Sequence, residues 1–263
     1  MKQTFILIIL FLSAFTQFAA AQKTRTQIAQ EAADTIVSVN IVKENGSIKS
    51  ATGFIVNPNG VIATAKHAVK DARLINLTLK NGAVSDEAKV LAVADLKDVD
   101  LALLKITAFN LPTVAFGDSD KVQVGEDITV IGNPRRLQNT VTNGLISQLR
   151  LVGDNIIWQQ ISAPISPSSS GSPVFNARGE VVGVALSSLQ GADNQNLNFS
   201  VPSNYLVELM SQNGYAAARP KPAEKVQYGQ NKKPLSIYGK ISEHMQKSWR
   251  ILKKKTKDFF SRK

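Results

Sequence analysis

Short apolar runs rich in β-forming residues recur through most of the chain, separated by polar turn residues, and predict β-strands. A first series of runs covers residues 35–42, 52–56, 61–65, 74–79, 89–94 and 101–106. A second series covers residues 113–116, 127–131, 140–149, 156–161, 172–175, 181–186 and 198–201. Because almost no helix separates the runs, we expect an all-β fold of two packed antiparallel β-barrels, at about residues 33–109 and 110–213.

Turn and helix signals divide these runs. Turn-forming residues stand at 57–60, 81–82 and 177–179, where Asn, Pro and Gly predict tight connections. A short helix is expected at 26–33, before the first strand. A second helix is expected at 203–211, after the last strand, with Ser203 as its N-cap.

The first 21 residues have the pattern of a cleaved export signal. Lys2 provides the positive end, an apolar stretch follows from Phe5 to Phe18, and small residues stand at 19–21. We expect cleavage before Gln22, because the apolar stretch is shorter than the roughly 20 residues of a bilayer span. An uncleaved membrane anchor is the alternative. The mature protein, a folded domain over residues 22–215 followed by a tail over residues 216–263, is expected to be periplasmic or secreted.

Composition excludes several classes of site. The 263-residue chain has no cysteine, which removes disulfide scaffolds, thiol nucleophiles and cysteine metal sites. It has only two histidines, so we expect no multi-histidine metal centre and no cofactor.

The net charge of +11 is concentrated in the tail. Residues 1–218 carry equal numbers of basic and acidic side chains, whereas residues 219–263 carry 14 Lys and Arg against 3 Asp and Glu. Residues 216–236 are rich in Pro, Lys, Gln and Asn, which is typical of a linker.

A helical period returns after residue 236 and places an apolar face beside basic residues. The apolar face is Tyr238, Ile241, Met245, Trp249, Leu252 and Phe259, and the basic residues are Lys240, Lys247, Arg250, Lys253, Lys254, Lys255 and Lys257. Residues 237–260 are therefore expected to form an amphipathic helix that either binds an anionic membrane surface or packs on the barrels. An acidic partner protein is a further alternative, and export argues against nucleic acid.

Three side chains of the neutral body, residues 1–218, have the chemistry that nucleophilic catalysis requires. Ser170 lies in a serine-rich loop between small residues and directly before a strand, which suits an exposed hydroxyl nucleophile. His67 is the only histidine of the body and therefore the only imidazole available as its base. Asp100 precedes a strongly apolar strand and is the candidate carboxylate to orient that base. Each feature alone also has a plain structural explanation.

Taken together and in chain order, seven segments between about residues 28 and 212 resemble the HtrA/Deg branch of the chymotrypsin-like serine proteases. They are 53–56 with 64–69, 100–106, 132–134, 140–147, 168–174, 179–184 and 198–202. The resemblance implies a double β-barrel that cleaves protein or peptide substrates and carries His67, Asp100 and Ser170 in its cleft. Trimeric assembly also occurs in the branch. A PDZ domain is not expected, because the remaining 50 or so residues are too few and too basic.

The resemblance also implies the roles of the residues near Ser170. The backbone N–H groups of Ser168 and Ser170 would form the oxyanion hole. Pro164 stands where trypsin-like members hold an acid, so cleavage is expected after small or apolar residues and not after Lys or Arg. Ile165, Leu186 and Ser188 are the candidates for lining that substrate pocket.

The chain departs from the branch at two glycines, which are replaced by Ser168 and Ser172. A side chain at position 168 would strain a backbone that requires glycine-like freedom, at a cost of about 1–3 kcal/mol. The alternative function is therefore a binding module that keeps the protease fold and has little or no catalytic activity.

Overall fold

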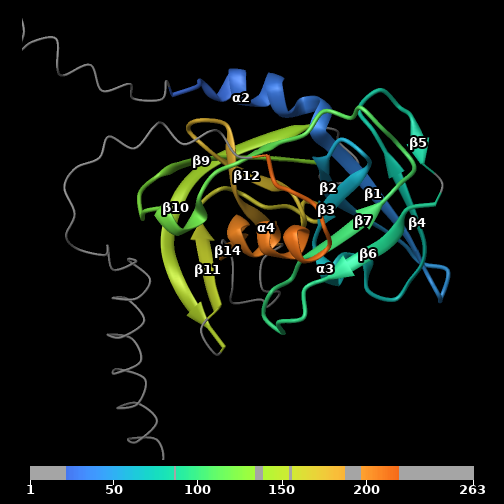
Figure 1. The fold of residues 1–263 in the computed structure, drawn as a ribbon. Helices are drawn as coiled ribbons and strands as arrows, with labels where there is room; N and C mark the ends of the chain where they lie inside the picture. Colours follow the sequence, from blue (N-terminus) through green and yellow to red (C-terminus); the bar gives the residue numbers. More distant parts are fainter. Residues whose placement is uncertain (1–21, 86, 134–138, 154–155, 187–196, 219–263) are drawn as a thin grey trace, which may run out of the picture.

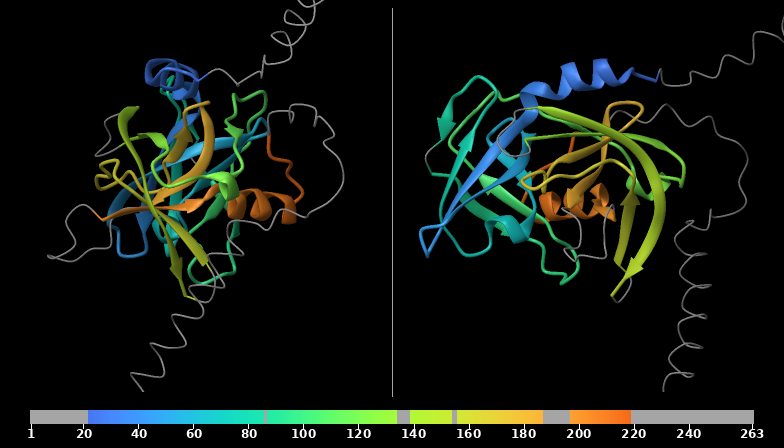
Figure 2. Two further views of the ribbon diagram at one scale, coloured as in Figure 1. Left: turned by 90° about the vertical axis from the view of Figure 1, so that its left-hand side faces the viewer. Right: turned by 180° about the vertical axis from the view of Figure 1, so that it is seen from behind.

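The computed structural model describes residues 22–85, 87–133, 139–153, 156–186 and 197–218. They form two seven-stranded sheets that lie side by side as two lobes, with an N-terminal helix across their top (Figures 1 and 2). The described strands thus confirm the all-β, two-lobed fold that the sequence predicts.

The first lobe is a strongly curled half-barrel. Its strands are β1 (Ile36–Lys43), β2 (Ile48–Asn57), β3 (Val61–Thr64), β4 (Ala72–Thr78), β5 (Val84–Ser85), β6 (Lys89–Val93) and β7 (Ala102–Lys105). They are ordered β5-β4-β1-β2-β3-β7-β6, and all the pairs are antiparallel. The N–H of Ala88, just before β6, donates to the carbonyl of Ile75 in β4 at 2.9 Å, which draws the two sides of the sheet together.

The second lobe is a closed barrel of six strands with one added strand. Its strands are β8 (Ala115–Phe116), β9 (Asp127–Gly132), β10 (Thr140–Val152), β11 (Ile156–Ile161), β12 (Pro173–Asn176), β13 (Glu180–Leu186) and β14 (Asn198–Pro202). The order is β12-β9-β10-β11-β14-β13-β8, and the pairing of β12 with β13 closes the barrel. The short β8 pairs with β13 in parallel, which is an exception to the antiparallel arrangement expected from the sequence.

Each lobe has its own apolar interior, and a third apolar cluster joins the lobes. Residues such as Val39, Ile62 and Leu104 fill the first lobe, and Val130 and Val174 belong to the interior of the second. The joining cluster brings Phe54 and Leu103 of the first sheet together with Phe175 and Leu186 of the second. Burial of this shared cluster stabilises the packing of one lobe on the other.

Short helices connect and cover the sheets. They are α2 (Arg25–Ala32), the 3₁₀ turn Ala33–Thr35, α3 (Lys66–Val69), the 3₁₀ turn Ser119–Lys121 and α4 (Ser203–Gln212). Thr24 caps α2 by a capping box with Gln27, since each side chain bonds the other residue's backbone N–H. α2 and α4 confirm the helices that the sequence predicts at 26–33 and 203–211. The short α3, which carries His67, was not expected from the sequence.

The predicted N-cap role of Ser203 is wrong. Pro202 is the N-cap of α4 and provides no capping side chain. The hydroxyl of Ser203 instead donates to the carbonyl of Gly117 at 3.5 Å, and the N–H of Asn204 donates to the hydroxyl of Ser119 at 3.0 Å. The helix is therefore capped by a residue that is distant in the sequence.

The predicted signal and the predicted basic helix at 237–260 lie outside the described residues. Within the described ranges, no helix combines the length and apolar character needed to cross a membrane.

Candidate active site

The candidate base lies at the end of a fully buried strand. All four residues of β3 are buried, and Ala65 is then the N-cap of α3, on which His67 lies. The side chain of His67 is 49% exposed. The buried strand therefore fixes the position of the backbone while the imidazole remains accessible to solvent and to a substrate.

Asp100 holds His67 by two hydrogen bonds. The backbone N–H of His67 donates to Oδ1 of Asp100 at 2.7 Å, and Nδ1 of the imidazole bonds Oδ2 of the same carboxylate. The preceding N–H, that of Lys66, donates to the carbonyl of Asp100 at 3.3 Å. Because an ionised carboxylate only accepts, Nδ1 carries the proton and Nε2 is left as the basic nitrogen.

The segment that carries Asp100 is anchored to the other lobe. The indole N–H of Trp158 in β11 donates to the carbonyl of Asp98 at 2.8 Å. The ring of Trp158 also packs against Phe199 of β14, with 5.7 Å between the ring centroids. The chain two residues before Asp100 is thus bonded to the second lobe.

Ser170 lies in a tight loop that precedes β12. The N–H groups of Ser169 and Ser172 donate to the carbonyls of Ser166 and Ser169, at 3.0 and 3.1 Å. The N–H of Gly171 donates to the carbonyl of Ala185 in β13 at 2.8 Å. These bonds turn the chain sharply around Ser170, which is 4% exposed.

Gly171 is needed for this turn. Its φ is +88°, and a Cβ at this position would lie 2.2 Å from the carbonyl oxygen of Thr52. A side chain would therefore be excluded both by the backbone conformation and by the close approach of β2.

Ser168 adopts a backbone conformation that favours glycine, as expected at a position where the HtrA/Deg branch has glycine. Its φ is +74°, in the left-handed region that non-glycine residues rarely occupy. Such a conformation costs a residue with a side chain about 1–2 kcal/mol. The loop thus has the geometry that suits glycine, although a serine stands there.

The replacement of the second glycine by Ser172 also has an energetic cost. Ser172 is fully buried, and its hydroxyl has no hydrogen-bond partner among the described residues. It packs against Gly132, at which a Cβ would lie 2.2 Å from the Ser172 oxygen. An unsatisfied buried hydroxyl destabilises the fold by about 1–3 kcal/mol.

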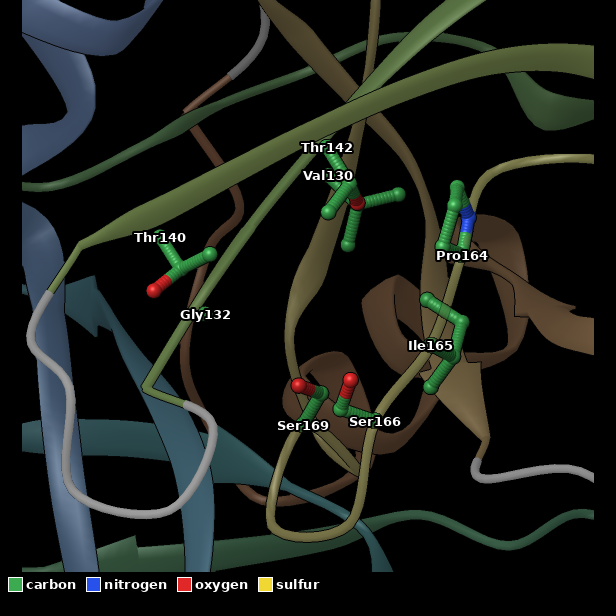
Figure 3. Close-up of a pocket in the computed structure, with 8 residues that line it drawn as sticks. All are labelled: Val130, Gly132, Thr140, Thr142, Pro164, Ile165, Ser166 and Ser169. Atoms are coloured by element: carbon green, nitrogen blue, oxygen red, sulfur yellow. The ribbon is translucent and has the colours of Figure 1, made fainter.

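The candidates for the substrate pocket lie in different surroundings. Ile165 lines a small pocket together with Pro164 and residues of β9 and β10 (Figure 3). Leu186 is buried in the cluster between the lobes and is not among the residues that line this pocket. Ser188 lies outside the described residues.

Sequence reasoning missed Thr52 and Trp158, which connect the two lobes at this site. Thr52 stands next to the recognised 53–56 segment, but no local pattern marks its hydroxyl as functional. Trp158 lies in a β-rich run in which a core aromatic residue is the ordinary interpretation.

Comparison with known families decides the classification of the chain. Residues 51–184, about half of its length, match the family described as the trypsin-like peptidase domain. The chain belongs to this family. The matched range contains His67, Asp100 and Ser170.

Similar proteins place the domain with the HtrA type. The chain is 40% identical over 160 residues to a putative serine protease HhoB of Synechocystis, which covers 58% of this chain and 37% of that protein. It is 42% identical over 158 residues to a probable periplasmic serine endoprotease, DegP-like, of Chlamydia muridarum, which covers 58% of this chain and 31% of that protein. The chain thus spans about a third of the length of these curated relatives.

Solved structures of serine proteases have the same fold. The HtrA-type protease AlgW with a tripeptide matches with a TM-score of 0.65 at 26% identity, over 72% of this chain and 63% of that one. The serine endoprotease from Yersinia pestis matches with a TM-score of 0.63 at 28% identity, over 73% and 67%.

Proposed function

We propose that this chain is an exported serine endopeptidase that cleaves peptide bonds with Ser170, His67 and Asp100. The single observation that carries the proposal is the pair of hydrogen bonds from the backbone N–H and Nδ1 of His67 to the carboxylate of Asp100, which leaves Nε2 of the imidazole as a base. The family to which the chain belongs and the printed names of its serine protease relatives support the same reaction.

In the proposed reaction, Oγ of Ser170 attacks the carbonyl carbon of the scissile peptide while Nε2 of His67 takes the hydroxyl proton. The imidazolium is stabilised by the Asp100 carboxylate and then protonates the leaving amine. A water molecule, deprotonated by the same imidazole, hydrolyses the acyl-enzyme and releases Ser170. The N–H groups of Ser168 and Ser170 stabilise the oxyanion in both steps.

The proposed substrates are proteins or peptides cleaved after small or apolar residues, because Pro164 offers no negative charge to bind Lys or Arg. Export rests on the signal-like residues 1–21 and on relatives that are named periplasmic. A binding module without catalysis is the second candidate, and the serines that replace two glycines at the loop favour it.

The proposal predicts a specific pH dependence of proteolysis. Residues 22–263, incubated with an unfolded protein such as casein, should cleave faster as the pH rises from about 5 to 8, because only neutral imidazole accepts the Ser170 proton. Mass spectrometry of the products should show cuts after small or apolar residues. His67→Ala and Ser170→Ala should fold normally and cleave at least 10³-fold more slowly. A rate that is flat across this pH range would contradict the role of His67.

A further inference from the structure

The hydroxyl group of Thr52 joins the nucleophile loop to the other lobe. Thr52 lies in β2 and is fully buried. Its Oγ1 donates to the carbonyl of Ser168 at 2.9 Å and accepts the N–H of Asn133 at 2.9 Å. The backbone N–H of Thr52 donates to the carbonyl of Ser170 at 3.0 Å. One residue of the first lobe therefore contacts both ends of the candidate oxyanion segment.

The bond from the Thr52 hydroxyl acts on the strained residue of the loop. Ser168 occupies the left-handed region at φ +74°, where its side chain is unfavourable. The direction of its carbonyl is set by its ψ angle. A buried donor that holds this carbonyl therefore restricts ψ and compensates part of the cost of the left-handed conformation.

The same residue is bonded to the strand that leads to His67. The hydroxyl of Thr64, the last residue of β3, donates to the carbonyl of Thr52 at 2.8 Å. Both threonines are completely buried. A continuous series of buried hydrogen bonds thus runs from Ser168 through Thr52 to the strand that ends just before His67.

The geometry points to Thr52 as a positioning residue that holds Ser168 in the conformation required for oxyanion stabilisation, an inference that rests on the proposed function. Thr52 does not contact the reacting atoms in this account. It acts through the carbonyl of Ser168, and it ties this carbonyl to the segment after β9 through the N–H of Asn133.

The test is Thr52→Val, which keeps the shape of the side chain and removes its hydroxyl. With a peptide substrate, we expect kcat to fall about 10- to 100-fold with KM within twofold, since loss of a whole oxyanion donor costs about 10²–10³. Thr52→Ser, which keeps the hydroxyl, should restore kcat to within about threefold. Thr35→Val is the matched control, because Thr35 is also buried and donates to a carbonyl, that of Ala32, at 2.7 Å.

A second comparison isolates the link to Ser168. In a Ser168→Gly background the left-handed conformation no longer needs compensation, so Thr52→Val should lower kcat less than threefold there. An equal loss of kcat in both backgrounds, or the same loss in Thr35→Val, would overturn the inference. So would an unchanged kcat in Thr52→Val.

A measurement that needs no catalysis separates this inference from the proposed function. Amide hydrogen exchange at Asn133 and at residues 166–172 should be faster in Thr52→Val than in wild type and in Thr35→Val. Unchanged exchange would overturn the positioning role. If the wild-type protein cleaves no substrate, the proposed function fails, and the exchange result still decides whether Thr52 holds the loop.

Discussion

Ser168 is the residue at which sequence and backbone geometry conflict most directly. It has a φ of +74°, which suits glycine, yet the sequence provides a side chain. The structure thus keeps the loop geometry at an energetic cost. The conflict makes Ser168 the clearest single position at which activity and stability should respond together.

Ser168→Gly should raise both turnover and thermal stability. Removing the Cβ relieves the cost of the left-handed backbone conformation, about 1–2 kcal/mol. The greater conformational freedom of glycine in the unfolded chain offsets part of this gain. We expect Tm to rise by about 3 °C and turnover to rise severalfold. Calorimetry and peptide hydrolysis measure the two effects.

Ser166→Gly is the matched control, because it makes the same substitution in the same loop at a residue without a positive φ. It should not raise either quantity. Equal or lower turnover in Ser168→Gly would show that the serine does not limit the loop.

Residue chemistry offered His67, Asp100 and Ser170 only as candidates, and the ordered resemblance to the HtrA/Deg branch then implied that they act together. The positioning role of Thr52 was not predictable in this way. Its hydroxyl contacts Ser168 and Asn133, which are 116 and 81 residues away along the chain. Contacts of this kind exist only once the two lobes have packed.

At the scale of elements, the carboxylate of Asp118 takes part in the contact between the 3₁₀ turn at 119–121 and the start of α4. Asp118 caps the turn by accepting the N–H of Asp120 at 3.2 Å. It also accepts the side-chain N–H of Asn204 at 2.9 Å and pairs with Lys121 at 3.2 Å. Desolvation by burial raises the pKa of Asp118, but the bonds from Asn204, Lys121 and Asp120 outweigh it and hold the pKa below its ordinary value of 3.8.

This lowered pKa predicts a loss of stability in acid. A carboxylate with a lower pKa in the folded state than in the unfolded state stabilises the fold above the unfolded value, and the contribution is lost as the pH falls through the folded value. Asp118→Asn should therefore be less stable than wild type at pH 7, and the gap should close below about pH 4.

Urea unfolding of both proteins at pH 7, 5, 4 and 3 measures this gap. Asp127→Asn controls for the loss of one surface charge, because its carboxylate is 74% exposed. A gap of constant size down to pH 3 would contradict the role given to Asp118.

The elements show what local sequence predicts and what it does not. Apolar β-rich runs between turn residues indicated most strands, because strands such as β3, β12 and β14 are buried at every position. The two-residue strand β5 and the four-residue helix α3 escaped prediction, since such short elements depend on their neighbours. The cap of α4 was not predicted either, because Ser119 lies 85 residues before Asn204, whose N–H it accepts.

For the whole molecule, the charge distribution separates a neutral body from a basic tail. Residues 219–263 hold 14 basic and 3 acidic side chains, which account for the entire net charge of +11. From the sequence we expect this tail to bind anionic membrane surfaces, where each Lys or Arg contributes about 1 kcal/mol.

Vesicle sedimentation tests the role of the tail. Residues 22–263 should sediment with vesicles of phosphatidylglycerol and phosphatidylcholine, and not with phosphatidylcholine alone. Added salt should reduce the binding, because it screens the charges. A chain truncated after Gln230 should remain in the supernatant. Equal sedimentation of the full and truncated chains would contradict this expectation.

The central claim is that Ser170 is a nucleophile activated by His67, and a fluorophosphonate probe tests it most directly. Attack by Oγ of Ser170 on phosphorus forms an O–P bond and releases fluoride, so each active molecule gains one phosphonyl group. Intact and peptide mass spectrometry of folded residues 22–263 should show one adduct, located on Ser170. The adduct should be absent in Ser170→Ala and should form far more slowly in His67→Ala. A folded wild-type protein that gains no adduct, or gains it equally in Ser170→Ala, would contradict the account.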